Sequence, residues 1–158
     1  GRMSKKIWIP TIILVVVTII IIVIFSMNKS NAEQTEFSAT DVFYDIDFDH
    51  KIKSFTFLSV GRAGTMTELV LSEQWEQKLV NGIKQSTFEK LASNYITPYY
   101  DYSFMIELND LVYFQVDTNN NIVLVISFEK DFNFTTYAFK DKEFFTLIEE
   151  AVKNASIK

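Results

Sequence analysis

The chain has no cysteine, one histidine, two prolines and four glycines among its 158 residues. Without cysteine there is no disulfide bond, no thiolate metal site and no thiol nucleophile. Any serine–histidine–acid relay would depend on His50 alone, and no Gly-x-Ser-x-Gly turn supplies a nucleophile. The glycines at Gly61 and Gly64 are not followed by the glycine, lysine and hydroxyl residue of a phosphate-binding loop. We therefore predict a non-enzymatic protein with no catalytic residue, no cofactor and no metal ion.

Charge is missing from one long stretch. Ile7 to Phe25 comprises nineteen residues without a charged side chain, and only Pro10, Thr11 and Thr18 interrupt its apolar side chains. At about 1.5 Å per residue a helix of this length reaches roughly 28 Å, close to the ~30 Å hydrocarbon thickness of a bilayer. We predict a transmembrane helix over residues 7–25 in direct contact with lipid.

The alternative for this stretch is a signal peptide that is cleaved after Ala32, where the small residues Ser30 and Ala32 precede Glu33. The apolar run is longer than the 7–15 residues typical of a signal peptide, which favours the uncleaved anchor. Both interpretations export the rest of the chain.

Basic residues mark one side of the anchor. Arg2, Lys5 and Lys6 precede it with no acid among them, whereas Lys29 is the only basic residue close behind it. Basic flanks are retained in the cytoplasm, so residues 1–6 are predicted to be cytoplasmic and the carboxy-terminal part extracytoplasmic. The predicted location is the cell membrane, crossed once.

Beyond the anchor, residues 26–41 are mostly polar and predict a tether, and residues 42–158 have the length of a single domain. From Glu33 onward there are 11 basic and 20 acidic residues, a net charge of −9. This charge disfavours nucleic-acid binding and favours a cationic protein or peptide as partner.

The pattern within the domain predicts an α+β fold. Strands over 52–60 and 65–71 flank a turn, and a helix capped by Ser72 runs to about Lys84, with Phe88 and Leu91 as a second helical turn or a continuation. Four strand-like runs and a last helix capped by Asp141 follow; the runs are residues 102–107, 111–116, 122–128 and 132–139. We expect one antiparallel sheet in the order strand, strand, helix, four-strand meander, helix, with both helices on one face.

Acidic and apolar residues alternate at the start of the domain. Asp45, Asp47 and Asp49 recur at a period of two, which predicts an extended segment with its carboxylates on one side. The spacing departs from a calcium loop, because the sixth position from Asp45 is His50 and the twelfth is Thr56, where glycine and glutamate are needed. We interpret the acids as a solvated face that could meet a cationic partner.

A second candidate surface is rich in tyrosine. Tyr99, Tyr100 and Tyr102 surround Asp101, and Tyr95 lies just before them. Tyrosine offers a broad contact area with few rotatable bonds and is enriched at interfaces. The alternative is that some of these rings complete the core between helix and sheet. Both interpretations stay open for the sequence alone.

The amino-terminal run Met3-Ser4-Lys5-Lys6-Ile7, the single anchor and the single α+β domain together resemble the small single-pass surface proteins of Gram-positive bacteria. Some proteins of that kind protect their producer against secreted toxins or bacteriocins. The resemblance is one of layout and transfers no site residue. It implies an immunity or inhibitor protein that captures an exported toxin. The alternative is an accessory or sensor subunit that joins a membrane transporter or signalling complex through its helix, with Thr11 and Thr18 near one helix face.

Overall fold

The computed structural model describes residues 2–30, 35–92, 99–126 and 134–158, with side chains over 9–25, 35–92, 99–126 and 135–158. The chain divides into two compact units, residues 1–34 and 35–158.

The first unit consists of helix α1 (Arg2–Ser30), which extends the predicted helix at both ends. Over residues 9–25 its apolar side chains are exposed, including Phe25 at 72%. Thr18 donates its hydroxyl to the carbonyl of Leu14 at 2.8 Å, so this polar group is satisfied within the helix. Within the described residues, no helix meets the length and hydropathy expected of a membrane span.

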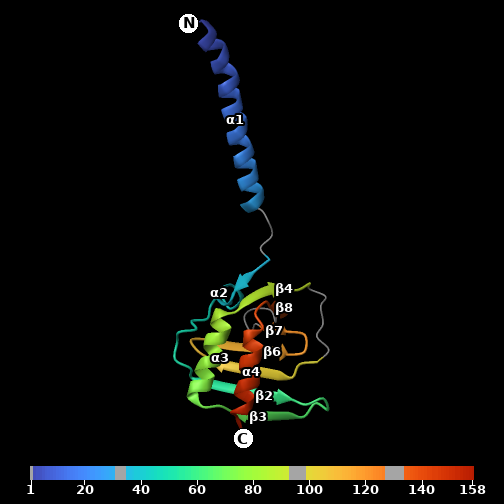
Figure 1. The fold of residues 1–158 in the computed structure, drawn as a ribbon. Helices are drawn as coiled ribbons and strands as arrows, with labels where there is room; N and C mark the ends of the chain where they lie inside the picture. Colours follow the sequence, from blue (N-terminus) through green and yellow to red (C-terminus); the bar gives the residue numbers. More distant parts are fainter. Residues whose placement is uncertain (1, 31–34, 93–98, 127–133) are drawn as a thin grey trace. The chain divides into compact units, whose positions relative to one another are not determined.

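The second unit is an α+β fold with one large antiparallel sheet, as predicted (Figure 1). In spatial order its strands are β1 (Phe37–Ser38), β4 (Thr87–Lys90), β8 (Phe134–Phe139), β7 (Ile122–Ile126), β6 (Leu111–Asp117), β5 (Tyr102–Glu107), β2 (Ser54–Val60), β3 (Met66–Val70) and β9 (Ser156–Ile157). The predicted hairpin of β2 and β3 and the predicted meander of β5 to β8 are both confirmed. The meander joins the hairpin through the pairing of β2 with β5.

Helices α3 (Glu73–Gln85) and α4 (Glu143–Lys153) cover one face of this sheet (Figure 1). The Ser72 hydroxyl accepts a hydrogen bond from the backbone N–H of Trp75 at 3.4 Å, which confirms the predicted cap of α3. The predicted cap of α4 is wrong. Lys142 holds the cap position without a side-chain hydrogen bond, and the Asp141 carboxylate accepts from the backbone N–H of Thr87 instead, at 3.3 Å.

The core between helices and sheet is built on phenylalanine. Phe57, Phe104 and Phe114 occupy paired positions on β2, β5 and β6, so the three rings share one face of the sheet. Their centroids are 4.5 Å apart for Phe57 and Phe104 and 4.9 Å apart for Phe104 and Phe114, in stacked geometry. Such pairs add about 0.5–1.5 kcal/mol beyond the area they bury.

The fold begins earlier than the predicted boundary at residue 42. Strand β1 and the short helix α2 (Ala39–Val42) lie within the stretch predicted to be a tether, and Ala39 is fully buried. Ser38 and Asp41 form a capping box that starts α2. The tether prediction is therefore wrong from Phe37 onward.

The extended segment predicted over Asp45 to Asp49 is also wrong. The chain makes turns between residues 43 and 50, and Phe43 and Phe48 are both buried in the core with ring centroids 5.9 Å apart. The alternation of acidic and apolar residues belongs here to a tightly turned loop. The buried rings of Phe43 and Phe48 hold this loop against the core.

Candidate functional site

The segment from Tyr99 to Tyr102 is held against the sheet by its own hydrogen bonds. Tyr99 donates its hydroxyl to the carbonyl of Val60 at 2.7 Å. The Asp101 carboxylate accepts from the backbone N–H of Thr118 at 2.9 Å and from the Thr118 hydroxyl. Tyr99 thus ties the segment before β5 to the end of β2, and Asp101 ties it to the turn after β6, so both residues have structural roles.

Tyr102 belongs to β5 and packs on Phe57, with ring centroids 5.4 Å apart. Burial raises the pKa of the Tyr102 phenol, and the nearby Asp101 and Glu149 carboxylates raise it further. Tyr100 is half-buried, and Tyr95 lies outside the described residues. The alternative in which these rings help to complete the core describes Tyr102 well.

Residues 43–50, here called the acidic loop, are held against the turn between β5 and β6 by hydrogen bonds to one asparagine. Asn109 accepts a hydrogen bond from the backbone N–H of Asp47 at 2.7 Å and donates one to the carbonyl of Asp45, also at 2.7 Å. Asp49 is paired, because Lys84 Nζ lies 2.6 Å from its Oδ1 atom. Of the three predicted acids, Asp49 therefore has its charge partly compensated.

The two predicted groups do not form one site. Tyr102 is the first residue of β5, whereas Asn109, which holds the acidic loop, follows the end of that strand. The strand has six residues, so the two ends are separated by roughly 17 Å at about 3.4 Å per residue. A surface that combines the predicted tyrosines with the predicted acids would have to span the full length of strand β5.

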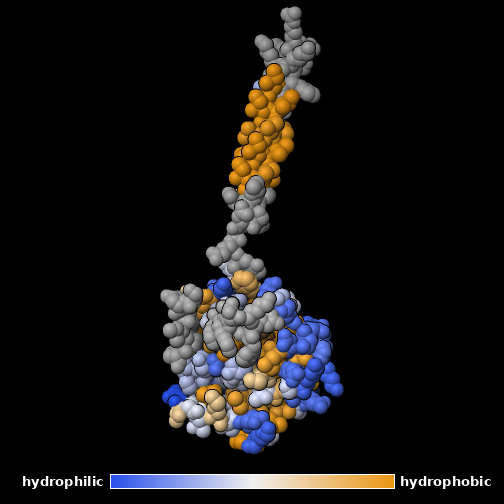
Figure 2. Space-filling model, turned by 180° about the vertical axis from the view of Figure 1, so that it is seen from behind, coloured by the Kyte–Doolittle hydropathy of each residue, from blue (hydrophilic) through white to orange (hydrophobic). Residues whose placement is uncertain are grey.

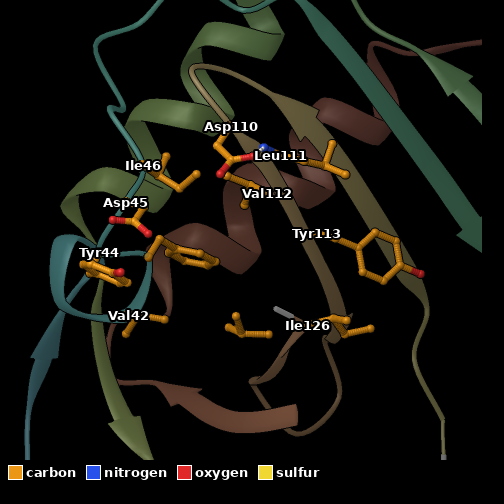
Figure 3. A pocket seen from close by; sticks show the side chains of 11 residues that line it. Val42, Tyr44, Asp45, Ile46, Asp110, Leu111, Val112, Tyr113 and Ile126 are labelled. Atoms are coloured by element: carbon orange, nitrogen blue, oxygen red, sulfur yellow. Dashed lines mark hydrogen bonds between the residues drawn. The ribbon is translucent and has the colours of Figure 1, made fainter. Parts of the chain in front are cut away.

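The structure brings one of the predicted acids into a different setting. A hollow of about 110 Å³, here called the acidic hollow, lies where the acidic loop meets the start of β6 and the end of β7 (Figure 3). It is lined by Val42, Phe43, Tyr44, Asp45, Ile46, Asp110, Leu111, Val112, Tyr113, Val125 and Ile126.

The lining of the acidic hollow combines an apolar floor with negative charge. Phe43, Val112 and Val125 are buried, whereas Tyr44 is 78% exposed. Asp45 and Asp110 supply two carboxylates, and neither takes part in an ion pair between residues that the structure describes. The hollow thus combines apolar contact surface with two carboxylates that form no ion pair with another described residue.

Sequence reasoning found Asp45 but missed Asp110. Asn109 and Asp110 lie between the strand-like runs 102–107 and 111–116, where the sequence predicts only a turn. Nothing local indicates that this turn meets a loop more than sixty residues earlier. The one local signal was an asparagine with an acid in a two-residue turn, a residue type that readily bonds to backbone groups.

A second hollow of about 320 Å³ lies between α3 and α4. Its lining mixes the charges of Lys78, Asp141 and Glu143 with polar side chains. Lys78 also lies over the Trp75 ring, with Nζ 4.3 Å from the ring centroid. This mixed lining selects no single class of ligand.

The face of the sheet opposite α3 and α4 exposes some apolar side chains, among them Met66, Met105 and Leu111 (Figure 2). Polar residues such as Thr56 and Gln115 lie between them on the same face, as the strand register shows. Apolar side chains spaced in this way are ordinary on protein surfaces. We assign no site to this face.

Within the described residues, no group of three or more histidine, cysteine or acidic side chains is arranged to hold a metal ion. The His50 ring nitrogen Nδ1 lies 2.9 Å from the carbonyl of its neighbour Lys51. Among the described residues, no serine or threonine hydroxyl is hydrogen-bonded to this ring.

Comparison of the chain with protein-family models, with curated proteins and with solved structures found no match.

Proposed function

We propose that this chain is a membrane-anchored, extracytoplasmic binding module that captures a cationic protein or peptide. Its most specific form is an immunity protein, which holds an exported toxin or bacteriocin in a stoichiometric complex and does not transform it. The anchor would be residues 7–25, with residues 1–6 in the cytoplasm.

The character of α1 supports the anchor. Residues 9–25 carry no charge and expose apolar side chains around the whole helix. A helix that is apolar on every side needs an apolar environment, which a bilayer supplies. The basic residues at its amino-terminal end support a cytoplasmic start for the chain.

The acidic hollow is the observation that carries the proposed partner class. Its two carboxylates lie next to buried apolar residues, in a domain whose net charge is strongly negative. A field of one sign accelerates the encounter with a partner of the opposite sign, and the local contacts then hold the complex. A basic partner fits both features.

The alternative of an accessory or sensor subunit would need α1 to pack against another membrane helix. Thr18, one of the two polar side chains considered for that packing, bonds to Leu14 within α1. This alternative therefore draws no support of its own from the structure.

A protection assay tests the proposal. The gene is deleted from the cell that makes the protein, and the mutant is challenged with the exported proteins of the same strain. We expect growth to fail and to be restored by the full chain, and equally by a version that carries an unrelated membrane anchor. Normal growth of the deletion mutant would refute the immunity form.

The partner class has its own test. Once the toxin against which the chain protects the cell has been identified, its affinity for the full chain in lipid nanodiscs is measured at low and high salt. We expect affinity to fall by about tenfold or more as added salt screens the acidic surface. Unchanged affinity would remove the cationic partner from the proposal.

A further inference from the structure

Resting on the proposed function, we infer that the acidic hollow receives one lysine or arginine side chain of the partner. The aliphatic part of that side chain would lie against the apolar floor, and its positive charge would sit by Asp45 and Asp110. The inference narrows the proposed partner class to a partner that presents a protruding basic residue.

The size of the hollow selects a side chain over a small molecule. Pockets for metabolites and cofactors span about 300–1,000 Å³. The acidic hollow has about 110 Å³, well below that range. One long side chain fills such a space.

The chemistry of the lining selects a basic side chain. Lysine and arginine combine a hydrocarbon stem with a charged end, and they bury the stem along apolar surface. Asp45 and Asp110 line the hollow together with the apolar Ile46, which Figure 3 draws between them. An acidic ligand would be repelled, and an entirely apolar one would leave both carboxylates without an opposite charge.

The backbone at Asp45 and the carboxylate of Asp110 are held in place before any partner arrives. Asn109 bonds to the backbone of the acidic loop at Asp45 and Asp47 and is itself the residue next to Asp110. The Asp110 carboxylate is oriented by a hydrogen bond that it accepts from the backbone N–H of Leu111 at 2.8 Å. Groups fixed in this way lose little entropy when they bind a cation.

A titration with short peptides tests this inference. The full chain, isotope-labelled and in lipid nanodiscs, is titrated with acetyl-Gly-Arg-Gly-amide and acetyl-Gly-Lys-Gly-amide while amide chemical shifts are recorded. We expect saturable shifts confined to residues 42–46 and 110–113, with dissociation constants on the order of 1–10 mM. The control peptide has citrulline, which keeps the shape of arginine and lacks its charge, and we expect no saturation with it.

Two conservative variants locate the charge. Asp45→Asn and Asp110→Asn keep the side-chain shape, and the amide introduced by Asp110→Asn would still offer an oxygen to the N–H of Leu111. We expect each variant to weaken peptide binding by about fivefold or more. Glu150→Gln on the exposed side of α4 removes the same charge elsewhere and should leave the binding unchanged. Spectra that overlay outside the hollow confirm that each variant is folded.

Three results would overturn the inference: equal binding of the arginine and citrulline peptides, an equal loss in the Glu150→Gln control, or no saturable shift at residues 42–46 and 110–113. If the captured protein still binds in a salt-sensitive manner after any of these results, only the assignment to the hollow fails. If salt-sensitive binding and protection are absent as well, the proposed function fails with it.

Discussion

At the scale of single residues, Asn109 does more for the candidate site than any of the acids. Its side-chain amide uses both of its polar ends to hold the acidic loop, through the N–H of Asp47 and the carbonyl of Asp45. The position of the acidic hollow therefore depends on a residue that does not line it.

Replacing this amide should loosen the loop. We expect Asn109→Ala to lower the free energy of unfolding by about 1–3 kcal/mol, since two hydrogen bonds worth about 0.5–1.5 kcal/mol each are lost. Urea unfolding of the full chain in nanodiscs measures this. Asn119→Ala is the matched control in the next turn, because the Asn119 side chain makes no hydrogen bond with a described residue. An equal effect of the two substitutions would contradict the role given to Asn109.

The ionisation of Tyr102 should make the stability of the fold depend on pH. The pKa of Tyr102 is raised from 10.0, mainly by burial and then by Asp101. Up to about pH 9 the phenol is protonated in both folded and unfolded chains and contributes no pH dependence. Above about pH 10 the unfolded chain ionises first and the folded chain resists, so stability should fall as pH rises.

The Tyr102→Phe variant isolates this effect, because it keeps the ring that packs on Phe57. We expect its urea midpoint to match that of the native chain at about pH 8 and to decline less at about pH 10.5. Tyr137, whose pKa burial also raises, should contribute to the decline that remains. Parallel declines in variant and native chain would show that Tyr102 ionises as freely when folded as when unfolded.

At the scale of elements, the two covering helices approach each other through a glycine. A Cβ atom at Gly82 of α3 would lie 2.9 Å from Leu147 Cδ2 and 3.1 Å from Phe144 Cδ2 of α4. The absence of a side chain there sets the distance between the helices.

Gly82→Ala should therefore destabilise the fold despite the higher helix propensity of alanine. Crowding costs about 1–3 kcal/mol and the propensity gain is about 1 kcal/mol, so we expect a net loss of about 1 kcal/mol in urea unfolding. Gln74→Ala on the exposed side of the same helix is the control and should be neutral or slightly stabilising. A Gly82→Ala chain that is stabilised would show that α4 yields to the added methyl group.

Strand β4 shows how distant pairing overrides local pattern. The sequence predicts Phe88 in a second helical turn or a continuation of the helix, yet it pairs with Phe37 of β1 and Phe139 of β8 and is fully buried. We expect Phe88→Ala to cost about 3–5 kcal/mol, the usual range for a buried phenylalanine, as measured by urea unfolding. Phe37→Ala, at a half-buried position of the two-residue edge strand, should cost clearly less. Equal costs would mean that β4 is not central to the core.

The predictable elements were those with a local signal. The runs that form β5 to β8 are rich in β-branched and aromatic residues and are separated in the sequence by polar residues, and α3 has both a serine cap and an apolar stripe. Strands β1, β4 and β9 have only two to four residues each, and their pairing with distant strands decides their form. The acidic hollow could not be predicted for the same reason, because Asp45 and Asp110 meet only after the sheet has formed.

At the scale of the whole molecule, both the charged and the apolar residues are unevenly distributed along the chain. The four basic residues before residue 31 lie in α1, and all 20 acids lie beyond it. Three ion pairs join described residues, Lys84 with Asp49, Lys140 with Glu36 and Lys158 with Glu68, and pairs at the surface stabilise little. Most of the acids therefore contribute to one long-range negative field.

The proposed orientation in the membrane leads to a prediction for intact cells. Protease added outside should digest residues beyond the anchor and leave a short amino-terminal fragment, which an antibody against a tag at each end would reveal. A cytoplasmic protein of the same cell serves as the control for lysis. Protection of the carboxy-terminal tag, under conditions that remove known surface proteins, would contradict the orientation.

The position of β1 at one edge of the sheet also governs how the second unit responds to force. Any tension on the chain at residue 35 is applied to a strand that is paired with β4 at only two positions, Phe37 with Phe88 and Ser38 with Thr87. Under tension applied at residue 35, the two pairs between β1 and β4 would break one after the other. The meander of β5 to β8 would bear no force until α2 had also detached. We therefore expect a weak pull on residue 35 to detach β1 first and to leave the rest of the sheet intact.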